Sequence, residues 1–391
     1  MDKRIYILTT ITFIVGLVEL IIGGILPLIA NDLDVSLGRA GLLITVFSLS
    51  FAISGPILLS LTAKIKRKKL ILIVLVLFLL SNVLAVVSTT FTPLLISRIL
   101  SAMFAALLVS LCLAIASQIT STTHRSRAIG VVLMGVSASL VFGVPFGLFL
   151  GNEWGWRAPF VLIVFIIMIL IVLMWLFMSE IEGKDALPVK AQFKALSHPK
   201  IIMTQSVSIL FYVGHLTLYA YLTPFLQTTL NLTGDSLSIM YLILGVAAIF
   251  GSWFGGYASD RFGTRKTIII VISLFATMLF MIFVVLSKPV MLVIALVLWS
   301  FLSWALTPAI QSQLVSIAPK TSDIQQSINN SNIHIGIAIG SLVGGINIDL
   351  YKVEFNSIIR WVIAVFALIL AIVALNYQRY EPNQSDGLLK Y

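Results

Sequence analysis

Long apolar stretches follow one another along almost the whole chain of 391 residues, and they constrain the fold more than any other feature. Hydrophobic residues make up 59% of the sequence and charged residues only 10%, against about 25% charged in a typical soluble domain. A bilayer core about 30 Å thick is crossed by roughly 20 apolar residues in a helix. The sequence therefore predicts an all-α membrane protein with twelve transmembrane helices, at residues 5–29, 39–62, 70–88, 93–118, 126–150, 156–178, 204–228, 237–258, 266–286, 289–313, 323–347 and 357–377.

The longest polar stretch, Ser179 to Lys200, divides the predicted spans into two sets of six. It predicts a six-helix bundle at 1–178, a cytoplasmic linker at 179–203, and a second six-helix bundle with a short cytoplasmic tail at 204–391. The loops after the second and eighth spans resemble each other when Ala63 is aligned with Asp260, about half a chain apart. Such parallel repeats are typical of a transporter class whose substrate site lies between the halves, near the membrane midplane.

Basic residues are distributed unevenly between the two sides of the predicted membrane. Most of the 25 Lys and Arg residues fall in the termini, the linker and the loops after even-numbered spans. Loops rich in Lys and Arg remain cytoplasmic, so both termini are predicted to lie in the cytoplasm, with the chain in the cell (inner) membrane. The apolar run after Arg4 is too long for a secretion signal and lacks a cleavage pattern, so it is interpreted as the first span.

Two charged residues inside spans are candidates for proton coupling. Glu19 lies in the middle of the first span, where inserting a carboxylate costs about 2.5–3.5 kcal/mol. Burial favours the neutral form, so Glu19 is predicted to take up and release protons; the alternative is a structural carboxyl group bound to a neighbouring helix. Arg98, near the start of the fourth span, keeps its charge and needs an anion or carbonyl groups. It is predicted to tune Glu19 or to bridge helices, the alternative being a side chain that extends toward the outer interface.

Polar side chains in the second half are candidate substrate contacts. His215 and His334 show no local spacing typical of a metal site, but they suit a polar cavity; the alternative is a buried histidine bound to a backbone carbonyl. Gln311 and Asn329 would be costly facing lipid, and amides suit a flat heterocycle or a polyol. Tyr219 is a candidate for stacking on such a ligand, or else an aromatic residue that faces lipid. The same reasoning applies to Gln205, Gln313, Asn330, Asn332, Tyr221, Trp299 and Trp304.

Several other classes of chemistry are excluded by the motifs that the sequence lacks. It contains no phosphate-binding GxxxxGK loop, no HExxH zinc helix and no GxSxG nucleophile. The single cysteine, Cys112, permits neither an internal disulfide nor a cysteine-rich metal site. The net charge of +10 is explained by membrane topology rather than by nucleic acid. We therefore expect no enzyme activity, no cofactor, no metal and no nucleic-acid partner.

Three local patterns resemble signatures of the major facilitator superfamily. The loop at 256–266 reads GYASDRFGTRK and resembles its gating loop, through Asp260, Arg261, Gly263, Arg265 and Lys266. Arg98 resembles the fourth-helix arginine motif. The stretch Gly143-Val-Pro145-Phe-Gly147 resembles the fifth-helix motif of its drug–proton antiporters. In the corresponding first-half loop, Ala63 and Lys66 replace the expected aspartate and glycine, a departure from the gating pattern.

The resemblance extends over essentially the whole chain to bacterial efflux pumps for purine bases and nucleosides. It is carried by segments 16–27, 214–225, 303–312 and 317–327. It implies a proton-coupled antiporter that exports its substrate by alternating access, with Glu19 as the acid on helix one that carries the proton. Its implied partners are a small-molecule substrate, protons and the lipid bilayer, and the implied state is a monomer. The alternatives are multidrug, antibiotic or sugar efflux and, in a different class, a membrane sensor that transports nothing.

Overall fold

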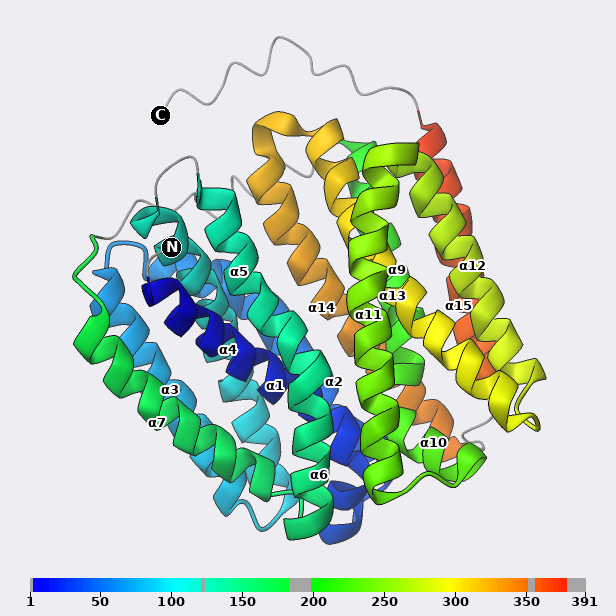
Figure 1. The fold of residues 1–391 in the computed structure, drawn as a ribbon, viewed down its shortest axis with the longest axis horizontal. Coiled ribbons are helices and arrows are strands. Elements are labelled where there is room, and N and C mark those ends of the chain that lie inside the picture. The colour runs from blue at the N-terminus through cyan, green and yellow to red at the C-terminus, as the bar shows by residue number, and fades with distance from the viewer. Residues whose placement is uncertain (1–2, 121–123, 183–197, 351–355, 378–391) are drawn as a thin grey trace.

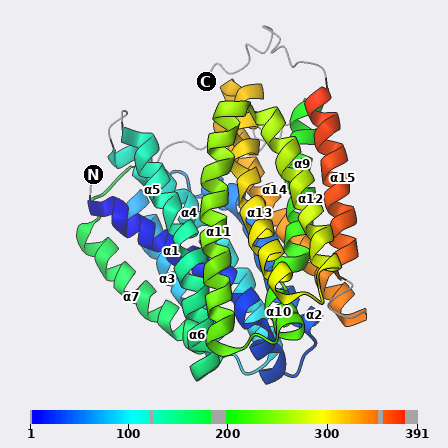
Figure 2. The ribbon, with the colours of Figure 1, turned by 45° about the vertical axis from the view of Figure 1, so that its right-hand side comes forward.

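The computed structural model describes residues 3–120, 124–182, 198–350 and 356–377, which contain twelve helices long and apolar enough to cross a membrane. The predicted all-α class and the predicted number of spans are therefore confirmed. Helices α1 to α7 gather on one side of the molecule and α9 to α15 on the other (Figures 1 and 2). Most of the predicted linker, residues 183–197, lies outside the described ranges.

The first side of the molecule contains α1 (Lys3–Asp32), α2 (Leu37–Leu61), α3 (Arg67–Val87), α4 (Phe91–Ile119), α5 (Arg125–Ala138), the π-helix η2 (Ser139–Gly143), α6 (Val144–Trp154) and α7 (Ala158–Phe177). The second side contains α9 (Pro199–Tyr219), α10 (Leu222–Leu230), α11 (Gly234–Phe262), α12 (Thr264–Val284), α13 (Pro289–Ile317), the 3-10 turn η3 (Pro319–Thr321), α14 (Ser322–Leu350) and α15 (Asn356–Asn376). We refer to these two sets as the N-terminal and C-terminal bundles.

Two predicted spans are not regular α-helices along their whole length. The fifth consists of α5, η2 and α6, and the seventh is interrupted between α9 and α10. A proline lies at both positions, and its ring lacks an N–H and clashes with the carbonyl group four residues earlier, although α1, α2 and α13 continue through Pro27, Pro56 and Pro308. For Pro145 this carbonyl belongs to Val141, inside η2. For Pro224 it belongs to Ala220, at the interruption. The span predicted at 204–228 is thus divided between α9 and α10.

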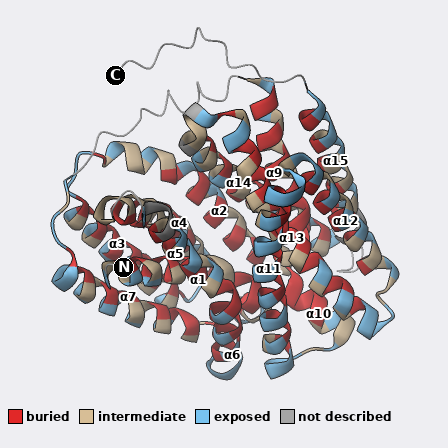
Figure 3. Cartoon of the chain, turned by 45° about the horizontal axis from the view of Figure 1, so that its top comes forward, coloured by how far each residue is buried: buried red, intermediate tan, exposed pale blue. Residues whose placement is uncertain are grey.

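Burial separates the inner from the outer helices. In α1 and in α9, 72% of the most apolar window is buried, against 28% in α7. Exposed residues lie mainly along the outer faces of the helices and at the loops (Figure 3). Helices α1 and α9 are therefore the central elements of the two bundles, and side chains on them are well placed to form a site.

The two ends of the molecule differ in how the bundles meet. We call the end that bears Lys3, Pro199 and Asn376 the linker end, and the end that bears Asp32, Trp154 and Leu230 the distal end. The bundles pack through α2 on α14, through α6 and η2 on α11, and through α10 on α1. In Figure 1 the helices α5 and α11 diverge toward the linker end, whereas α6 and α11 lie side by side at the distal end.

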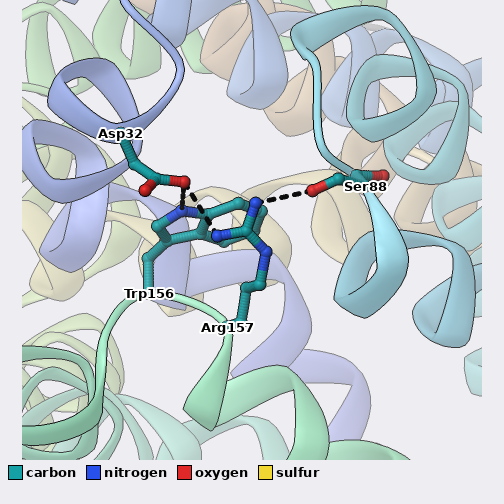
Figure 4. Close-up of polar contacts among 4 residues, drawn as sticks. All are labelled: Asp32, Ser88, Trp156 and Arg157. Carbon is teal, nitrogen blue, oxygen red and sulfur yellow. Dashed lines mark hydrogen bonds and ion pairs between the residues drawn. The ribbon is translucent and has the colours of Figure 1, made fainter.

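A cluster of polar contacts ties three loops of the N-terminal bundle together at the distal end (Figure 4). The Asp32 carboxylate accepts hydrogen bonds from Trp156 Nε1 and from Arg157 NH1, each at 2.8 Å. The same guanidinium donates to the backbone carbonyl of Ser88 at 2.7 Å and lies over the Trp156 ring, 4.2 Å from its centroid. Arg157, the residue before α7, thus joins the ends of α1 and α3 to the start of α7.

We expect Asp32→Ala to lower the apparent melting temperature of the purified protein. Hydrogen bonds to charged groups contribute about 1.5–3 kcal/mol, but the Arg157 and Asp32 side chains are 34% and 47% exposed, so screening should reduce the loss to about 1 kcal/mol. Thermal unfolding in detergent measures the change. Glu153→Ala is the matched control, because Glu153 is an exposed carboxylate at the same end. Equal melting temperatures for the two variants would mean that the cluster adds no stability.

Candidate functional site

A cavity of about 330 Å³ lies between the two bundles. One wall comes from α1, α2, α4 and α5, and the other from α9, α11, α13 and α14. On α1 the lining residues Val15, Glu19 and Gly23 recur every four residues, which places them on one helix face. The surface is mainly apolar with a few polar groups, as is typical of small-molecule sites.

Glu19 meets a histidine from the opposite bundle inside this cavity. His334 Nδ1 lies 3.5 Å from Glu19 Oε1, and the two side chains are 7% and 16% exposed. The imidazole stacks on Phe51 of α2, with 4.0 Å between the ring centroids. Of the basic side chains that the structure describes, only His334 comes within 4 Å of the Glu19 carboxylate. The contact links α14 to α1 and α2 across the bundle interface.

Arg98 lies behind Glu19 rather than in the cavity. Its side chain is 1% exposed, donates from NH1 to the carbonyl of Val18 at 2.8 Å, and lies 4.2 Å from the centroid of the Phe47 ring. It also approaches the carbonyl of Leu43 on α2 at 3.5 Å. Arg98 therefore bridges α4 to α1 and α2, and does not extend toward the membrane surface. Its guanidinium thus lies against the backbone of Val18, the residue next to Glu19.

Aromatic residues of the C-terminal bundle form the opposite wall. The His215 ring lies between Tyr219, at a centroid distance of 5.4 Å, and Trp299, at 4.9 Å. Among the described residues, His215 Nδ1, the Tyr219 hydroxyl and Trp299 Nε1 are buried and have no hydrogen-bond partner. An unpaired buried polar group costs about 1–3 kcal/mol. A ligand that offered complementary groups to His215 and Tyr219, which line the cavity, would recover part of this cost.

The predicted amide residues separate into two sets. Gln311 lines the cavity, together with Asn330 and Thr307. Asn329, which the sequence places at the site, instead donates to Gln205 Oε1 at 3.0 Å and to the Ser208 hydroxyl at 2.7 Å, between α14 and α9. Its amide nitrogen is bonded within the C-terminal bundle, whereas its Oδ1 atom is buried and has no hydrogen-bond partner among the described residues; Asn330 lines the cavity instead.

The fifth-helix motif packs directly against the helix that carries Glu19. A Cβ atom added at Gly143 would lie 3.0 Å from the Leu17 side chain, and one added at Gly147 would overlap Ile21. Pro145 starts the regular helix that follows η2. The missing side chains therefore set how closely α6 approaches α1 on the side away from the cavity.

A close seam joins α2 of the N-terminal bundle to Tyr221 and α14 of the C-terminal bundle at the distal end. We call it the distal seam and define it by Ser36, Gly38, Gly41, Tyr221, Ser341, Gly345 and Asp349. The Asp349 carboxylate accepts from the Ser36 hydroxyl at 2.8 Å and from the Gly38 backbone at 3.0 Å, so it caps the start of α2. Ser341 donates to the Gly41 carbonyl at 3.1 Å. Nearby, Thr223 donates to the carbonyls of Gly23 and Gly24 at 3.0 and 2.9 Å.

The residues of the predicted gating loop form the last turn of α11 and the first turn of α12, with only Gly263 between the helices, at the linker end and away from the cavity. Asp260, Arg261 and Lys266 are exposed, and Gly263 has a φ of 87°, a conformation that favours glycine. Arg265 hydrogen-bonds to Asn376 of α15, within its own bundle.

The first-half loop instead contacts the start of the linker. Lys66 Nζ lies 2.9 Å from Glu180 and 3.4 Å from Glu182, and the Arg67 backbone donates to Ile181 at 2.8 Å. The hydrogen bond from Lys66 lowers the pKa of the Glu180 carboxyl, and the same bond raises the pKa of Lys66. Lys66, which stands where the resemblance predicts a glycine, thus connects this loop to the start of the linker through ion pairs with Glu180 and Glu182.

Sequence reasoning located much of this site but did not pair its members. The structure gathers Glu19, His215, Tyr219, Gln311 and His334 around one cavity. Sequence reasoning missed Tyr212 and Thr307, whose hydroxyl groups lie 2.7 Å apart in the wall, as well as Ser48. For Ser48 a signal was present, because Ile44, Ser48 and Phe51 follow helical spacing on α2.

Known proteins with similar sequences cover nearly the whole chain. The chain is 35% identical over 382 residues to a Bacillus subtilis (strain 168) protein named "Uncharacterized MFS-type transporter YbcL", covering 98% of this chain and 97% of that protein. It is 25% identical over 367 residues to a Helicobacter pylori (strain P12) protein named "Probable sugar efflux transporter", covering 93% of each.

Two solved structures and a family profile point the same way. A bacterial homologue of the human lysosomal transporter Spinster, crystallised in an inward-facing and occupied conformation, has a TM-score of 0.82 at 18% identity and covers 97% of this chain and 98% of that one. The D-xylose–proton symporter has a TM-score of 0.79 at 14% identity, with 97% of each chain covered. The profile of the Major Facilitator Superfamily matches residues 8–322 and 206–388. The chain is a membrane transporter of the Major Facilitator Superfamily.

Proposed function

We propose that this protein is a proton-coupled secondary transporter that exports small molecules by alternating access, with purine bases and nucleosides as the leading substrate class. The observation that carries the proposal is the cavity between the bundles, where Glu19 is the one acidic residue among the lining residues and no Lys or Arg joins it. A carboxylate in such a place is a functional group by default. In this proposal Glu19 binds the proton and Arg98 favours its release.

The substrate is held by the aromatic and polar wall of the C-terminal bundle. His215, Tyr219 and His334 offer unpaired nitrogen or oxygen atoms, and Gln311 and Asn330 offer amides. A planar base with hydrogen-bonding groups at its edge matches this combination. Because the described lining residues include no Lys or Arg, nucleotides and other anions are disfavoured relative to neutral bases.

The linker end faces the cytoplasm in this proposal, and the distal seam closes the outer side. The support is the concentration of basic residues at the linker end. The described conformation then has its bundles joined on the outer side, and Asp260, Arg261, Gly263, Arg265 and Lys266 belong to a cytoplasmic loop that acts when that side closes. The protein would work as a monomer, because each chain contains both bundles.

Sugar efflux is the second candidate, and the Helicobacter pylori relatives named as sugar efflux transporters favour it. Amide side chains can bind the hydroxyl groups of a sugar as well as the edge of a purine base. The aromatic wall is compatible with either substrate. Multidrug or antibiotic export is the third candidate. A sensor without transport is the alternative from a different class.

Transport by purified protein in liposomes with an imposed pH gradient separates these functions. The probes are labelled hypoxanthine, adenine, guanosine, D-xylose, lactose and the lipophilic cation tetraphenylphosphonium. Gradient-dependent movement of the purines, abolished by an uncoupler, supports the proposal. Movement of the sugars alone would indicate sugar efflux, and movement of the cation alone would indicate drug export. The absence of flux for every probe would favour the sensor that transports nothing.

We expect Tyr219→Phe to raise the KM for the transported base by about 3- to 10-fold, since one hydrogen bond contributes about 0.5–1.5 kcal/mol. The ring stacking on His215 is retained, so the maximal rate should change little. Initial rates over a range of hypoxanthine concentrations give both quantities. Tyr257→Phe is the control, because Tyr257 lies exposed on α11 and stacks on Trp253 outside the cavity. An unchanged KM in Tyr219→Phe would show that the Tyr219 hydroxyl group does not bind the substrate.

A further inference from the structure

The contact between His334 and Glu19 joins two ionisable groups that belong to different bundles. Their 3.5 Å separation places Nδ1 opposite a carboxylate oxygen, and among the described residues this nitrogen has no hydrogen-bond partner. Arg98, the other cation near Glu19, uses its guanidinium on backbone carbonyls and on the face of Phe47. The imidazole is therefore the group placed to exchange a proton directly with the carboxylate.

The surroundings hold the imidazole in this position. On the side of its own bundle, α14 packs so closely on α9 that a Cβ atom at Gly336 would lie 2.6 Å from the carbonyl oxygen of Ile209. On the other side, Phe51 of α2 covers the ring at 4.0 Å. Residue 334 is thus anchored to the C-terminal bundle while its ring lies between α1 and α2 of the other bundle. Any separation of the bundles at this level has to break the contact with Glu19.

We propose that His334 is the second proton-binding residue of this transporter, and that it exchanges a proton with Glu19 as the bundles move. In the closed contact, the proton on Nδ1 of a charged imidazole passes to Oε1 of Glu19. The products are a neutral imidazole and a neutral carboxylic acid, so charge and atoms balance without another reactant. Neutral groups separate at a lower cost than an ion pair in a low-dielectric cavity, so this transfer allows the bundles to part. The inference rests on the proposed proton coupling and adds a residue to it.

The remaining titratable groups around the pair do not replace His334. Tyr212, His215 and Tyr219 of α9 line the same cavity, and Arg98 of α4 lies behind Glu19. Helices α2, α5, α11 and α13 contribute no titratable side chain to the lining. His215 stacks between Tyr219 and Trp299 on the opposite wall. A substrate-binding histidine alone would alter KM, whereas a proton-binding one also alters the pH dependence of the conformation without substrate.

The test measures that pH dependence directly. Spin labels are placed at Asn152→Cys on α6 and Lys288→Cys before α13, two exposed sites of different bundles at the distal end; the native Cys112 is buried. Distance distributions in lipid nanodiscs are recorded between about pH 5 and 8, where histidine changes charge. We expect a pH-dependent distribution in the wild type, a midpoint displaced by about one pH unit or more in His334→Gln, and no dependence in Glu19→Gln. The control His198→Gln, at the start of α9, should behave as the wild type.

Each outcome decides between the two proposals. A wild-type midpoint in His334→Gln overturns the role of His334 and leaves the proposed function intact. A wild type without pH dependence, combined with flux that ignores the pH gradient, overturns the proton coupling itself. If His334→Gln fails to fold, His334→Asn is measured in the same way. Infrared difference spectra of wild-type protein with isotope-labelled histidine supply an independent readout, in which histidine and carboxyl bands must titrate over the same pH interval.

Discussion

Replacing Glu19 with glutamine is expected to abolish the accumulation of substrate driven by a pH gradient, while substrate exchange without a gradient persists. The amide has nearly the same shape as the carboxylic acid and preserves the cavity wall, but it can neither bind nor release a proton. The side chain contacts His334 across the bundle interface and lies beside the Arg98 bridge. In the proposed cycle the proton passes through this residue. Glu19 is the one acidic residue among the described lining residues, so no other acid in the cavity can take over its role.

Everted membrane vesicles and labelled hypoxanthine measure both quantities, with and without an uncoupler. Glu153→Gln makes the same chemical change at an exposed position of α6 and should behave as the wild type. Loss of both driven accumulation and exchange would indicate a role in binding or folding. Driven accumulation at the wild-type level would falsify the assignment of Glu19 as the proton carrier.

The second large effect is expected from Gly41→Val in the distal seam. A Cβ atom at Gly41 would overlap the Tyr221 hydroxyl, which itself donates to the carbonyl of Ser341 at 2.9 Å. Overpacking of this kind costs about 1–3 kcal/mol, and here the cost falls only on the conformation in which the distal end is closed. The equilibrium should move toward the distally open form by a factor of about 5–150. Transport should fall while the protein remains folded.

Disulfide cross-linking between the two bundles measures the equilibrium between the distally closed and distally open forms. The Ser36 and Asp349 side chains are in hydrogen-bond contact, so cysteines at these two positions should form a disulfide when the distal end is closed. We expect the cross-link to form readily when Gly41 is retained and to be lost in the Gly41→Val background. The matched control is Gly130→Val, where a Cβ atom meets nothing within 4 Å. Equal cross-linking in all three backgrounds would show that the seam accommodates the added side chain.

The helices could be predicted from the sequence because each span is long, apolar and bounded by charged or turn-forming residues. The single carboxylate in the first span was equally visible. Its partner was not, because 315 positions separate Glu19 from His334 and their meeting depends on how two helices of different bundles face each other. A rule based on local spacing contains no information about such a contact.

Two smaller features of the structure could not be predicted from the sequence. Asn329 and Asn330 are adjacent in a stretch of α14 rich in polar residues, and a helix turns by about 100° between neighbours. Without an apolar pattern to fix the facing side, the sequence did not distinguish the buried amide from the lining one. The interruption before α10 coincides with Pro224, but a proline alone does not predict a break, because α1 continues through Pro27 and α13 through Pro308.

The wide turn of η2 affects the direction in which the small residues of the fifth span face along α1. Gly135, Ser139, Gly143, Gly147 and Gly151 recur every four positions and all face α1. In an uninterrupted α-helix a four-residue repeat advances by about 40° per step, so a row of this length would wind away from its neighbour. The π turn takes up one additional residue, which removes about 100° of the roughly 160° that the four steps would accumulate. The row thereby stays against α1 from Thr12 to Ile25, on both sides of Glu19.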